Sequence, residues 1–521
     1  MPSCGNRELP YQNKVPYKSR KQEVMKSKLI GWLAPMVLFL STLSLRAQPL
    51  AVLHTFMGPG NANLDGAGPA TELALSGDVL YGTTSGGANG SGTNNYGTIY
   101  SLNTDGSGFT VLHTFSDVTN CVIGTNALGF PITISVNRDG LMPRGNLILS
   151  GDTLYGAASG GGANGSGTVF SISTSGSNFT VLHAFATNFP AGSLGFTNAD
   201  GAIPNSLVLS GDTLYGTTEQ GGTNGCGTFF SLDTNGPGFN LLHTFQPAEG
   251  KNPESILALS GNTLYGTTAL GGLGSGTVYC LATNGAGFTV LHSFTSGADS
   301  TGPYLSGLVA CGGRLFGTTD VGATNETSAI YSMNVNGSDY REIFYLGTNF
   351  HRVAPSGALW LCGDTLYGTT QQGGANGLGQ VFSISTNGGD FTTVYSFTKP
   401  HAGTNTDGAE PRAGLVLSGA NLFGTAYFGG TGNGTVFRLT VAPTVTSFHL
   451  VGSDLVFSGI NGLAGRPYTI LANTNLALPL NQWTPVATNV LLGGGNFRIT
   501  ATNAANPMSA QQCYLLQTPT R

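Results

Sequence analysis

Charged residues are scarce in this chain of 521 residues, because Asp, Glu, Lys and Arg together make up only 9% of it. The formal net charge is −5. A domain that binds nucleic acid usually carries a clustered basic surface, and this balance provides none. The composition therefore argues against nucleic acid as a partner.

Helices and metal-binding cysteine spacings are also missing. Between residues 48 and 521 no amphipathic helix of useful length occurs, and none of the seven cysteines belongs to a C-x-x-C or similar metal-ligand pattern. Cys311 and Cys362 occupy the same position in successive repeats, which places them too far apart for a disulfide. We therefore expect free cysteines that pack as small apolar residues.

Glycine and apolar residues are plentiful instead. The chain has 81 glycines and is 40% hydrophobic, which is enough for a real core and unlike a disordered polar chain. Many Thr, Ser and Asn residues accompany them, as is typical of short strands joined by tight turns. The composition predicts an all-β protein.

The N-terminus has the pattern of an export signal. Lys26 and Lys28 precede the apolar run LIGWLAPMVLFLSTLSL, and RAQ then offers cleavage after Ala47. The run contains Pro35 and is shorter than the roughly 20 residues that span a membrane. We predict a signal peptide over residues 1–47, with translation starting at Met25, and no membrane span after its cleavage.

One repeat dominates the rest of the chain. The string LSGDTLYGTT at residues 209–218 belongs to a unit of four strand-like segments, here SLVLSG, DTLYGTT, GTFFSLDT and FNLLHTF. We name these segments a, b, c and d, from the innermost to the outermost. A Leu-Tyr/Phe-Gly triplet opens segment b of every copy, at Leu80, Leu154, Leu214, Leu264, Leu315, Leu366 and Leu422.

The order of the segments predicts how the ring of repeats closes. A d segment, VLHTF at Val52, precedes every a, b or c segment, and the last a–b–c set, ending in GTVFRL at Leu439, has no d segment after it. Pairing the two closes a seven-bladed β-propeller over residues 48–441 and removes its exposed sheet edges. Residues 442–447 are predicted to be a linker, and residues 448–521 a small β-sandwich.

The repeat LVLSGDTLYGTTEQGGTNGCGTFFSLDTNGPGFNLLHTF resembles the GloVer tandem repeat of exported bacterial proteins in the choice-of-anchor group. The resemblance covers about residues 50–440 and recurs in every predicted blade. It implies a protein that is secreted or held at the cell surface or in the periplasm of a bacterium. The biochemical role of this group is not established, so the resemblance supplies no catalytic residues.

Comparison of the seven copies separates scaffold residues from candidates for chemistry. The d-segment histidines, such as His113 and His183, give way to Phe344 and Tyr395 in two copies, so a packing ring explains them better than a metal ligand. The triplet tyrosine is Phe316 in another copy. A packing role in the blades explains both positions.

The loops that join segment d to the next segment a carry one further motif. In six copies an acidic residue stands four positions before a proline, at Asp65, Asp139, Asp200, Glu249, Asp299 and Asp407, and Arg144 and Arg412 follow two of these prolines. An Asp-Gly turn is the simpler interpretation. The alternative is a site for calcium or a hydroxyl-rich ligand, because carboxylate and amide oxygens suit both. No other cofactor is expected.

The topology predicts where a ligand would bind. If segment a is innermost, the d–a and b–c loops emerge on one face, which we call the loop face. We expect a monomeric, non-enzymatic scaffold that binds a glycan or an exported protein there. The alternatives are a glycan-processing hydrolase or lyase that uses loop carboxylates, and a structural or adhesive surface module.

Overall fold

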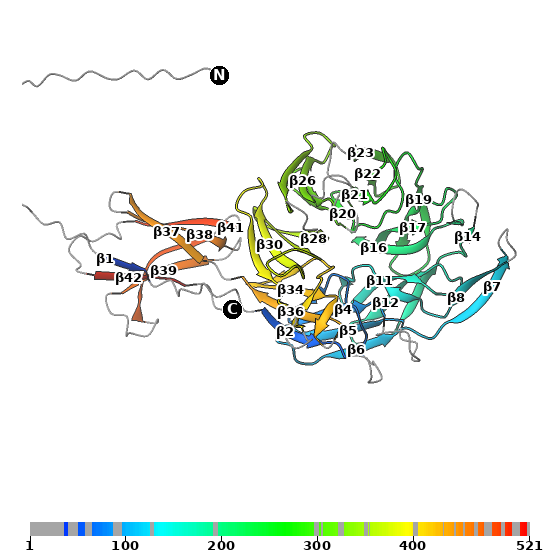
Figure 1. Ribbon diagram of the computed structural model, residues 1–521, viewed down its shortest axis with the longest axis horizontal. Coiled ribbons are helices and arrows are strands. Elements are labelled where there is room, and N and C mark those ends of the chain that lie inside the picture. Colours follow the sequence, from blue (N-terminus) through cyan, green and yellow to red (C-terminus); the bar gives the residue numbers. More distant parts are fainter. Residues whose placement is uncertain are drawn as a thin grey trace, which may run out of the picture.

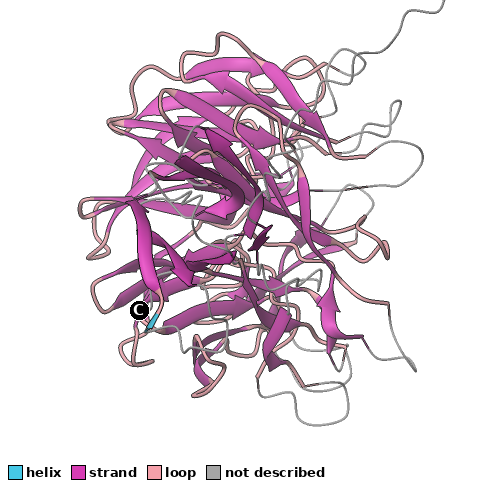
Figure 2. Ribbon diagram, turned by 90° about the vertical axis from the view of Figure 1, so that its left-hand side faces the viewer, coloured by secondary structure: helices cyan, strands magenta, loops and turns pink. Residues whose placement is uncertain are grey.

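The computed structural model describes residues 36–39 and 50–517 except 58–64, 87–95, 126–129, 191–195, 296–301, 304–305, 321–327, 348–352, 354, 400–404, 431, 442–443, 452–453, 463–466, 474–481, 491–494 and 503–510. Its named elements are β-strands, and strands and connecting loops make up nearly all of the described chain (Figure 2). Seven small sheets stand in a ring, as Figure 1 shows. The chain is therefore an all-β, seven-bladed β-propeller, as the sequence predicts.

Each blade is an antiparallel sheet of four strands in the order a, b, c, d. Blade 1 contains β3 (Ala74–Ser76), β4 (Val79–Thr84), β5 (Thr98–Asn103) and β6 (Thr110–Thr114). Blade 2 contains β10 (Ile148–Ser150), β11 (Thr153–Gly160), β12 (Thr168–Ser173) and β13 (Thr180–Ala184), with β9 (Leu141–Pro143) paired to β11. Blade 3 contains β16 (Ala202–Ser210), β17 (Thr213–Gln220), β18 (Thr228–Asp233) and β19 (Asn240–Thr244).

The next three blades repeat this order. Blade 4 contains β20 (Ala258–Ser260), β21 (Thr263–Thr268), β22 (Thr277–Ala282) and β23 (Thr289–Ser293). Blade 5 contains β24 (Val309–Cys311), β25 (Arg314–Thr318), β26 (Ala329–Asn334) and β27 (Arg341–Tyr345). Blade 6 contains β28 (Pro355–Cys362), β29 (Thr365–Thr370), β30 (Gln380–Ser385) and β31 (Thr392–Ser396).

Blade 7 joins the two ends of the propeller. It contains β33 (Val416–Ser418), β34 (Asn421–Ala426), β36 (Thr435–Thr440) and, as its outermost strand, β2 (Leu50–Thr55). Strand β2 pairs antiparallel with β36, with Val52 opposite Phe437 and His54 opposite Val436. The predicted closure by the N-terminal strand is confirmed.

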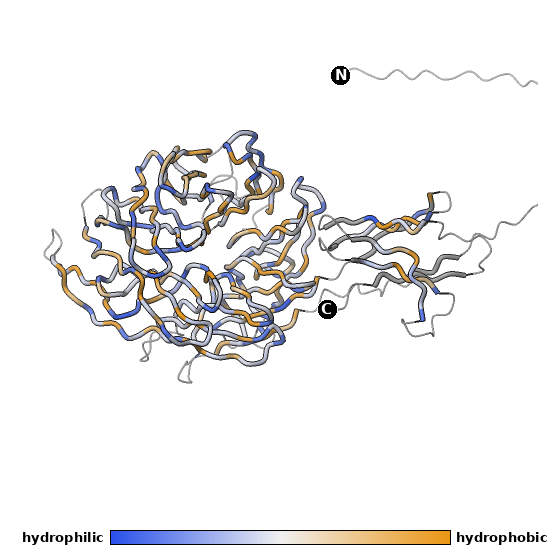
Figure 3. The backbone as a smooth tube through the Cα atoms, turned by 180° about the vertical axis from the view of Figure 1, so that it is seen from behind, coloured by the Kyte–Doolittle hydropathy of each residue, from blue (hydrophilic) through white to orange (hydrophobic). Residues whose placement is uncertain are grey.

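The Leu-Tyr/Phe-Gly triplet is explained by packing within and between blades. Leu214 is completely buried, and Tyr215 joins the core that blade 3 shares with blade 4. A Cβ on Gly216 would lie 2.5 Å from Cζ of Phe230 on the neighbouring strand, so only glycine leaves room for that ring. Hydrophobic stretches accordingly recur in every blade (Figure 3).

Three two-stranded ribbons lie in the loops of the ring. They are β7 (Thr119–Thr125) with β8 (Pro131–Val136), β14 (Phe189–Pro190) with β15 (Phe196–Thr197), and β32 (Asn405–Ala409) with β35 (Phe428–Gly430). The first two lie in the long d–a insertions that precede and follow blade 2. They project from the ring near the labels β7 and β14 in Figure 1.

The C-terminal region forms two more sheets. One has the order β37 (Thr444–Val451), β38 (Asp454–Gly462), β41 (Gly495–Ala501), and the other has the order β1 (Met36–Phe39), β42 (Gln511–Gln517), β39 (Pro467–Asn473), β40 (Thr484–Val490). Phe457, Ile470 and Ile499 belong to one buried cluster that both sheets share. The predicted sandwich of this region stays a prediction.

Two segments that the sequence placed outside the C-terminal domain contribute strands to these sheets. Strand β37 begins at Thr444, inside the segment 442–447 predicted as a linker, because the alternating residues of Thr-Val-Thr-Ser extend the strand. Met36–Phe39 of the predicted signal peptide pair in parallel with β42, and the rest of residues 1–47 lie outside the described part. Cys121, Cys226, Cys280 and Cys311 are free.

Candidate functional site

The acidic residues of the d–a loops, which the sequence offered as ligands, hold the loops to the blades. We call Asp65, Asp139, Asp200, Glu249 and Asp407 the loop acids. Four of them accept a hydrogen bond from Nε2 of the d-strand histidine, at 3.1 Å for Asp65, 3.0 Å for Asp139 and 2.9 Å for both Asp200 and Glu249. In blade 6 the hydroxyl of Tyr395 takes the place of the imidazole and donates to Asp407 at 2.7 Å.

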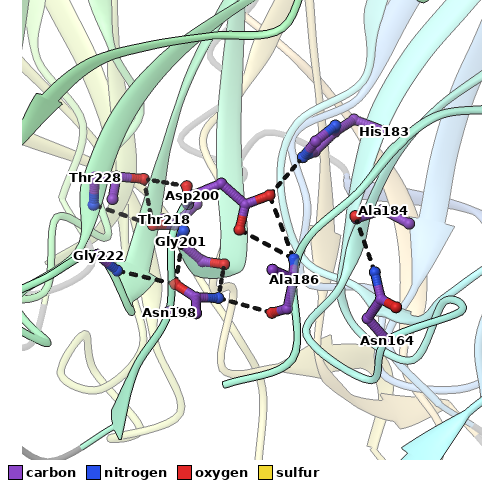
Figure 4. Close-up of polar contacts among 10 residues, drawn as sticks. All are labelled: Asn164, His183, Ala184, Ala186, Asn198, Asp200, Gly201, Thr218, Gly222 and Thr228. Atoms are coloured by element: carbon purple, nitrogen blue, oxygen red, sulfur yellow. Dashed lines mark hydrogen bonds and ion pairs between the residues drawn. The ribbon is translucent and has the colours of Figure 1, made fainter. Parts of the chain in front are cut away.

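The junction between blades 2 and 3 shows the whole arrangement (Figure 4). The carboxylate of Asp200 lies between His183 and the backbone N–H of Ala186, which donates to it at 3.0 Å. Asn198 Oδ1 accepts from the backbone N–H groups of Gly201 and Gly222, so it joins the d–a loop to the b–c loop. The Asn-x-Asp-Gly motif therefore fastens the d–a loop to the preceding d strand and to the b–c loop. We call this set of contacts the staple.

The same histidines hold neighbouring blades together. His113 of blade 1 stacks on Phe179 of blade 2 with ring centroids 3.9 Å apart and the ring planes within 7°. Equivalent stacks occur at five further seams, between His54 and Phe109, His183 and Phe239, His243 and Phe288, His292 and Tyr340, and Phe344 and Phe391. The packing role predicted for these rings is confirmed, and the bond to the acid is an addition that the sequence analysis missed.

The remaining predicted acid, Asp299, lies outside the described residues. The described loop acids each belong to a different blade junction, and each accepts hydrogen bonds from a side chain and a backbone N–H of that junction. In the described part of the chain, no group of three or more His, Cys, Asp or Glu residues is placed to hold a metal ion. Whether calcium binds stays a prediction.

A different place on the loop face is hollow. A cavity of about 460 Å³ is lined by residues of blades 1, 2, 3, 4, 6 and 7 and the loops that lead into them, so it lies on the propeller axis. Its polar lining includes Glu72, Ser85, Arg144, Asn146, Asn205, Ser206, Glu219, Glu254, Arg412 and Tyr427. We call this the axial cavity. Its volume is in the range of small-molecule sites.

Both predicted arginines line this cavity. The guanidinium carbon of Arg412 lies 3.8 Å from the centroid of the Tyr427 ring, and one terminal nitrogen is 2.9 Å from Glu410. Arg412 Nε is buried and has no hydrogen-bond partner. The charge of Arg144 partly offsets the rise in pKa that burial causes at Glu219 and Glu254.

The three cavity glutamates, Glu72, Glu219 and Glu254, have perturbed ionisation. Desolvation raises the pKa of Glu72 to about 7, although its carboxylate accepts a backbone hydrogen bond from Ala358 at 3.1 Å. Desolvation and the nearby carboxylate of Glu219 together raise the pKa of Glu254 to about 7. Desolvation also raises the pKa of Glu219. Glu72 and Glu254 are therefore half-ionised near neutral pH. Carboxyls in this state change their ionisation when a charged group binds beside them, which marks a candidate functional site.

The cavity floor is held by contacts between blades. Asn146 Oδ1 accepts from the hydroxyl of Ser206 at 3.2 Å and from the backbone N–H of Leu207 at 3.3 Å. Ser206 Oγ in turn accepts from the backbone N–H of Leu257 at 3.4 Å. These bonds hold the segments at the start of the innermost strands in place. The side chains beside them therefore extend into the cavity from a rigid backbone.

The cavity glutamates are not repeated from copy to copy, so comparison of recurring residues does not reveal them. Two repeat positions whose residue changes between copies point to the cavity instead. The residue after the loop proline is Ala70, Arg144, Asn205, Glu254, Tyr304, Ser356 and Arg412 in chain order, and the residue after segment b is Ser85, Ser159, Glu219, Ala269, Asp320, Gln371 and Tyr427. Seven of these side chains with polar groups line the axial cavity: Ser85, Arg144, Asn205, Glu219, Glu254, Arg412 and Tyr427.

The fold and this site define a repeat-built β-propeller with a polar axial cavity. Comparison with known families identifies the repeat: the model described as the Gloeobacter/Verrucomicrobia repeat matches residues 39–195, 191–347 and 274–476. The chain belongs to this family, and the resemblance predicted from the repeat is confirmed. No curated protein matches the chain.

Three solved structures are distantly similar to this chain. Two structures of the extracellular domain of a regulatory system from B. thetaiotaomicron, described as a two-component and as a one-component system, are 12% identical, with a TM-score of 0.43 over 80% of this chain and 45% of theirs. A nidogen/laminin complex is 15% identical, with a TM-score of 0.30 over 52% of this chain and 77% of that one. The fold assignment rests on the seven blades themselves. Among the described residues, no helix has the length and hydrophobicity to cross a membrane.

Proposed function

We propose that this protein is an exported β-propeller scaffold that binds the end of a glycan in its axial cavity. The observation that carries this proposal is the contrast between repeat positions. The positions that build the blades recur, whereas the two positions that line the cavity differ in nearly every copy. A scaffold with no ligand would have no reason to gather its varied polar residues at one hollow on the axis.

The chemistry of the lining supports a hydroxyl-rich ligand. Carboxyls, guanidinium groups and the amides of Asn146 and Asn205 provide both donors and acceptors for sugar hydroxyls. Tyr427 adds an aromatic ring to the wall.

Export is supported by the apolar run after Lys28 and by the cleavage motif at Ala47. Mass spectrometry of the protein isolated from its own cells tests this part, because cleavage predicts a mature chain that begins at Gln48. An intact peptide spanning Ala47 and Gln48 in the mature protein would contradict it.

Binding is tested with a glycan array followed by calorimetric titration of the best oligosaccharide, with and without calcium. We expect one glycan class to bind at micromolar affinity and the Arg144→Ala variant to lose at least tenfold. The control is Asp212→Asn on the opposite face, since the corresponding turn position of blade 4 is already Asn262. An array with no binder would overturn the proposal and leave a protein ligand or an adhesive role. An unchanged affinity for Arg144→Ala would overturn the axial cavity as the place where the glycan binds.

Hydrolysis of the bound glycan is the second candidate. The observation that favours it is the coupling of Glu219 and Glu254, because burial and the neighbouring carboxylate keep Glu254 partly protonated near pH 7. A glycosidase needs such an acid beside a second carboxylate. Incubating the array's best oligosaccharide with the protein and measuring new reducing ends decides this. Release that Glu254→Gln abolishes would establish hydrolysis, and no release would leave binding alone.

A further inference from the structure

The axial cavity has an uneven charge distribution. Three glutamates from three blades face it, against two arginines. Arg412 is already paired with Glu410 and stacked on Tyr427. Among the described residues, Arg144 is the one cation whose charge opposes that of Glu219 and Glu254, so ionisation of both carboxyls leaves that side of the cavity with excess negative charge.

We infer that the ligand of the axial cavity is a glycan whose terminal sugar carries a protonated amine, which lies against Glu219 and Glu254. The inference rests on the proposed function and adds the charge of the ligand to it. An ammonium group donates three hydrogen bonds and supplies the positive charge that two adjacent carboxylates need. A neutral sugar would satisfy the hydrogen bonds but leave the carboxyls under the same repulsion.

The ionisation of the cavity provides a distinctive readout. The charged and titratable groups that face it from the described elements are Glu72, Glu219, Glu254, Arg144, Arg412 with its partner Glu410, and Tyr427. The pKa of Glu254 is about 7 in the empty cavity. A bound ammonium favours the carboxylate and lowers this pKa, so binding at pH 5.5, where both the sugar amine and Glu254 start out protonated, must release protons. Affinity should therefore rise as the pH increases from 4.5 to 6, where the sugar amine is still mostly protonated.

The sign differs for a neutral sugar. Such a ligand covers the carboxyls without a compensating charge, so it favours their protonated form and takes protons up on binding. The direction of proton transfer therefore distinguishes the two ligand classes independently of affinity. The number of protons is measured by calorimetry of the same titration in buffers with different ionisation enthalpies.

The experiment compares three β-1,4-linked oligosaccharides of equal length on the full chain: glucosamine, N-acetylglucosamine and glucose oligomers. We expect the glucosamine oligomer to bind at least tenfold more tightly than the other two at pH 5.5, with proton release. Glu219→Gln and Glu254→Gln should each reduce the ratio of the glucosamine to the glucose affinity at least threefold. The Asp212→Asn control should leave the ratio unchanged and excludes a general attraction between a cationic oligomer and an acidic protein.

The outcomes separate the two proposals. Equal affinity for the three oligomers, or proton uptake with glucosamine, would overturn the inference and leave the proposed glycan site standing. Glucosamine binding with a ratio that neither glutamine variant changes would also overturn it, because the amine would then lie elsewhere. If none of the three oligomers binds and the array is also silent, the proposed function fails together with the inference.

Discussion

The loop acids and the cavity glutamates are the same chemical group in two different settings. A loop acid such as Asp200 accepts hydrogen bonds from an imidazole and a backbone N–H, and the equivalent acids in other blades have closely similar partners. A cavity glutamate such as Glu254 has no counterpart at its repeat position and lies in a hollow with its pKa raised. In a repeat protein, a residue that recurs in nearly every copy marks what the scaffold needs, and a charged residue found in only one or two copies marks a role outside the scaffold.

The copies themselves provide a natural test of the staple. In blade 5 the d-strand ring is Phe344, which cannot donate a hydrogen bond, and the residue four positions before the following proline is His351 instead of an acid. In blade 6 Tyr395 can donate, and the acid Asp407 is present and accepts its bond. Donor and acceptor are thus kept or lost together, although His351 itself lies outside the described residues.

Removal of a loop acid gives the largest expected effect on stability. Asp200→Ala deletes the acceptor for His183 Nε2 and for the Ala186 N–H. Hydrogen bonds to a charged group are each worth a few kcal/mol, so the free energy of unfolding should fall by about 2 to 3 kcal/mol. Denaturant titration measures this change. If the variant were as stable as the original protein, the staple would not hold the loop.

A change of a cavity glutamate should act in the opposite direction. The pKa of Glu254 in the folded protein is about 7, above its ordinary value of 4.5, so the stability present below pH 4.5 is lost as the pH rises through 7. Glu254→Gln removes this loss, and at pH 8 it should raise the free energy of unfolding by about 1 to 2 kcal/mol. Denaturant titrations at pH 5 and pH 8 test the sign, with Glu219→Gln for comparison. A variant that is less stable at pH 8 would show that the carboxylate supports the fold.

The seam between blades 6 and 7 gives the smallest expected effect. At the position where the other blades hold an aromatic ring, blade 7 has Leu50, which packs in the same cluster as Tyr395. Leu50→Phe should add a stacked pair and raise stability by about 0.5 to 1 kcal/mol. Thermal denaturation measures the gain. Leu53→Phe is measured in parallel as a control, because residue 53 is not the repeat position at which the rings stack. No gain would mean that the seam has no room for a ring.

Sequence reasoning predicted the scaffold well because the scaffold recurs. Seven copies fixed the strand pattern, and the unpaired d segment at Val52 identified the closing strand, since a ring has only one way to pair it. The carboxylates were harder. Asp139 and His113 are 26 residues apart and come together only when the long d–a loop folds back onto the outermost strand of blade 1. Their pairing could therefore not be inferred from spacing.

The sequence did not predict the axial cavity. It singled out Arg144 and Arg412 as residues of the d–a loops, and the strand order predicted the loop face on which they lie. Glu72 and Glu219 stand at different repeat positions and converge only when the blades are arranged around the axis. Their raised pKa values depend on desolvation within the assembled ring, which no single repeat contains.

Calorimetric titration of the glucosamine oligomer into three proteins tests the central claim most directly: the original chain, Asp200→Asn and Glu254→Gln, all at pH 7 and at a temperature where each is folded. The account predicts that Asp200→Asn keeps the original affinity despite its lower stability, and that Glu254→Gln loses at least tenfold despite its higher stability. If Asp200→Asn lost the ligand and Glu254→Gln kept it, the binding site would lie at the loop acids and the account would be wrong.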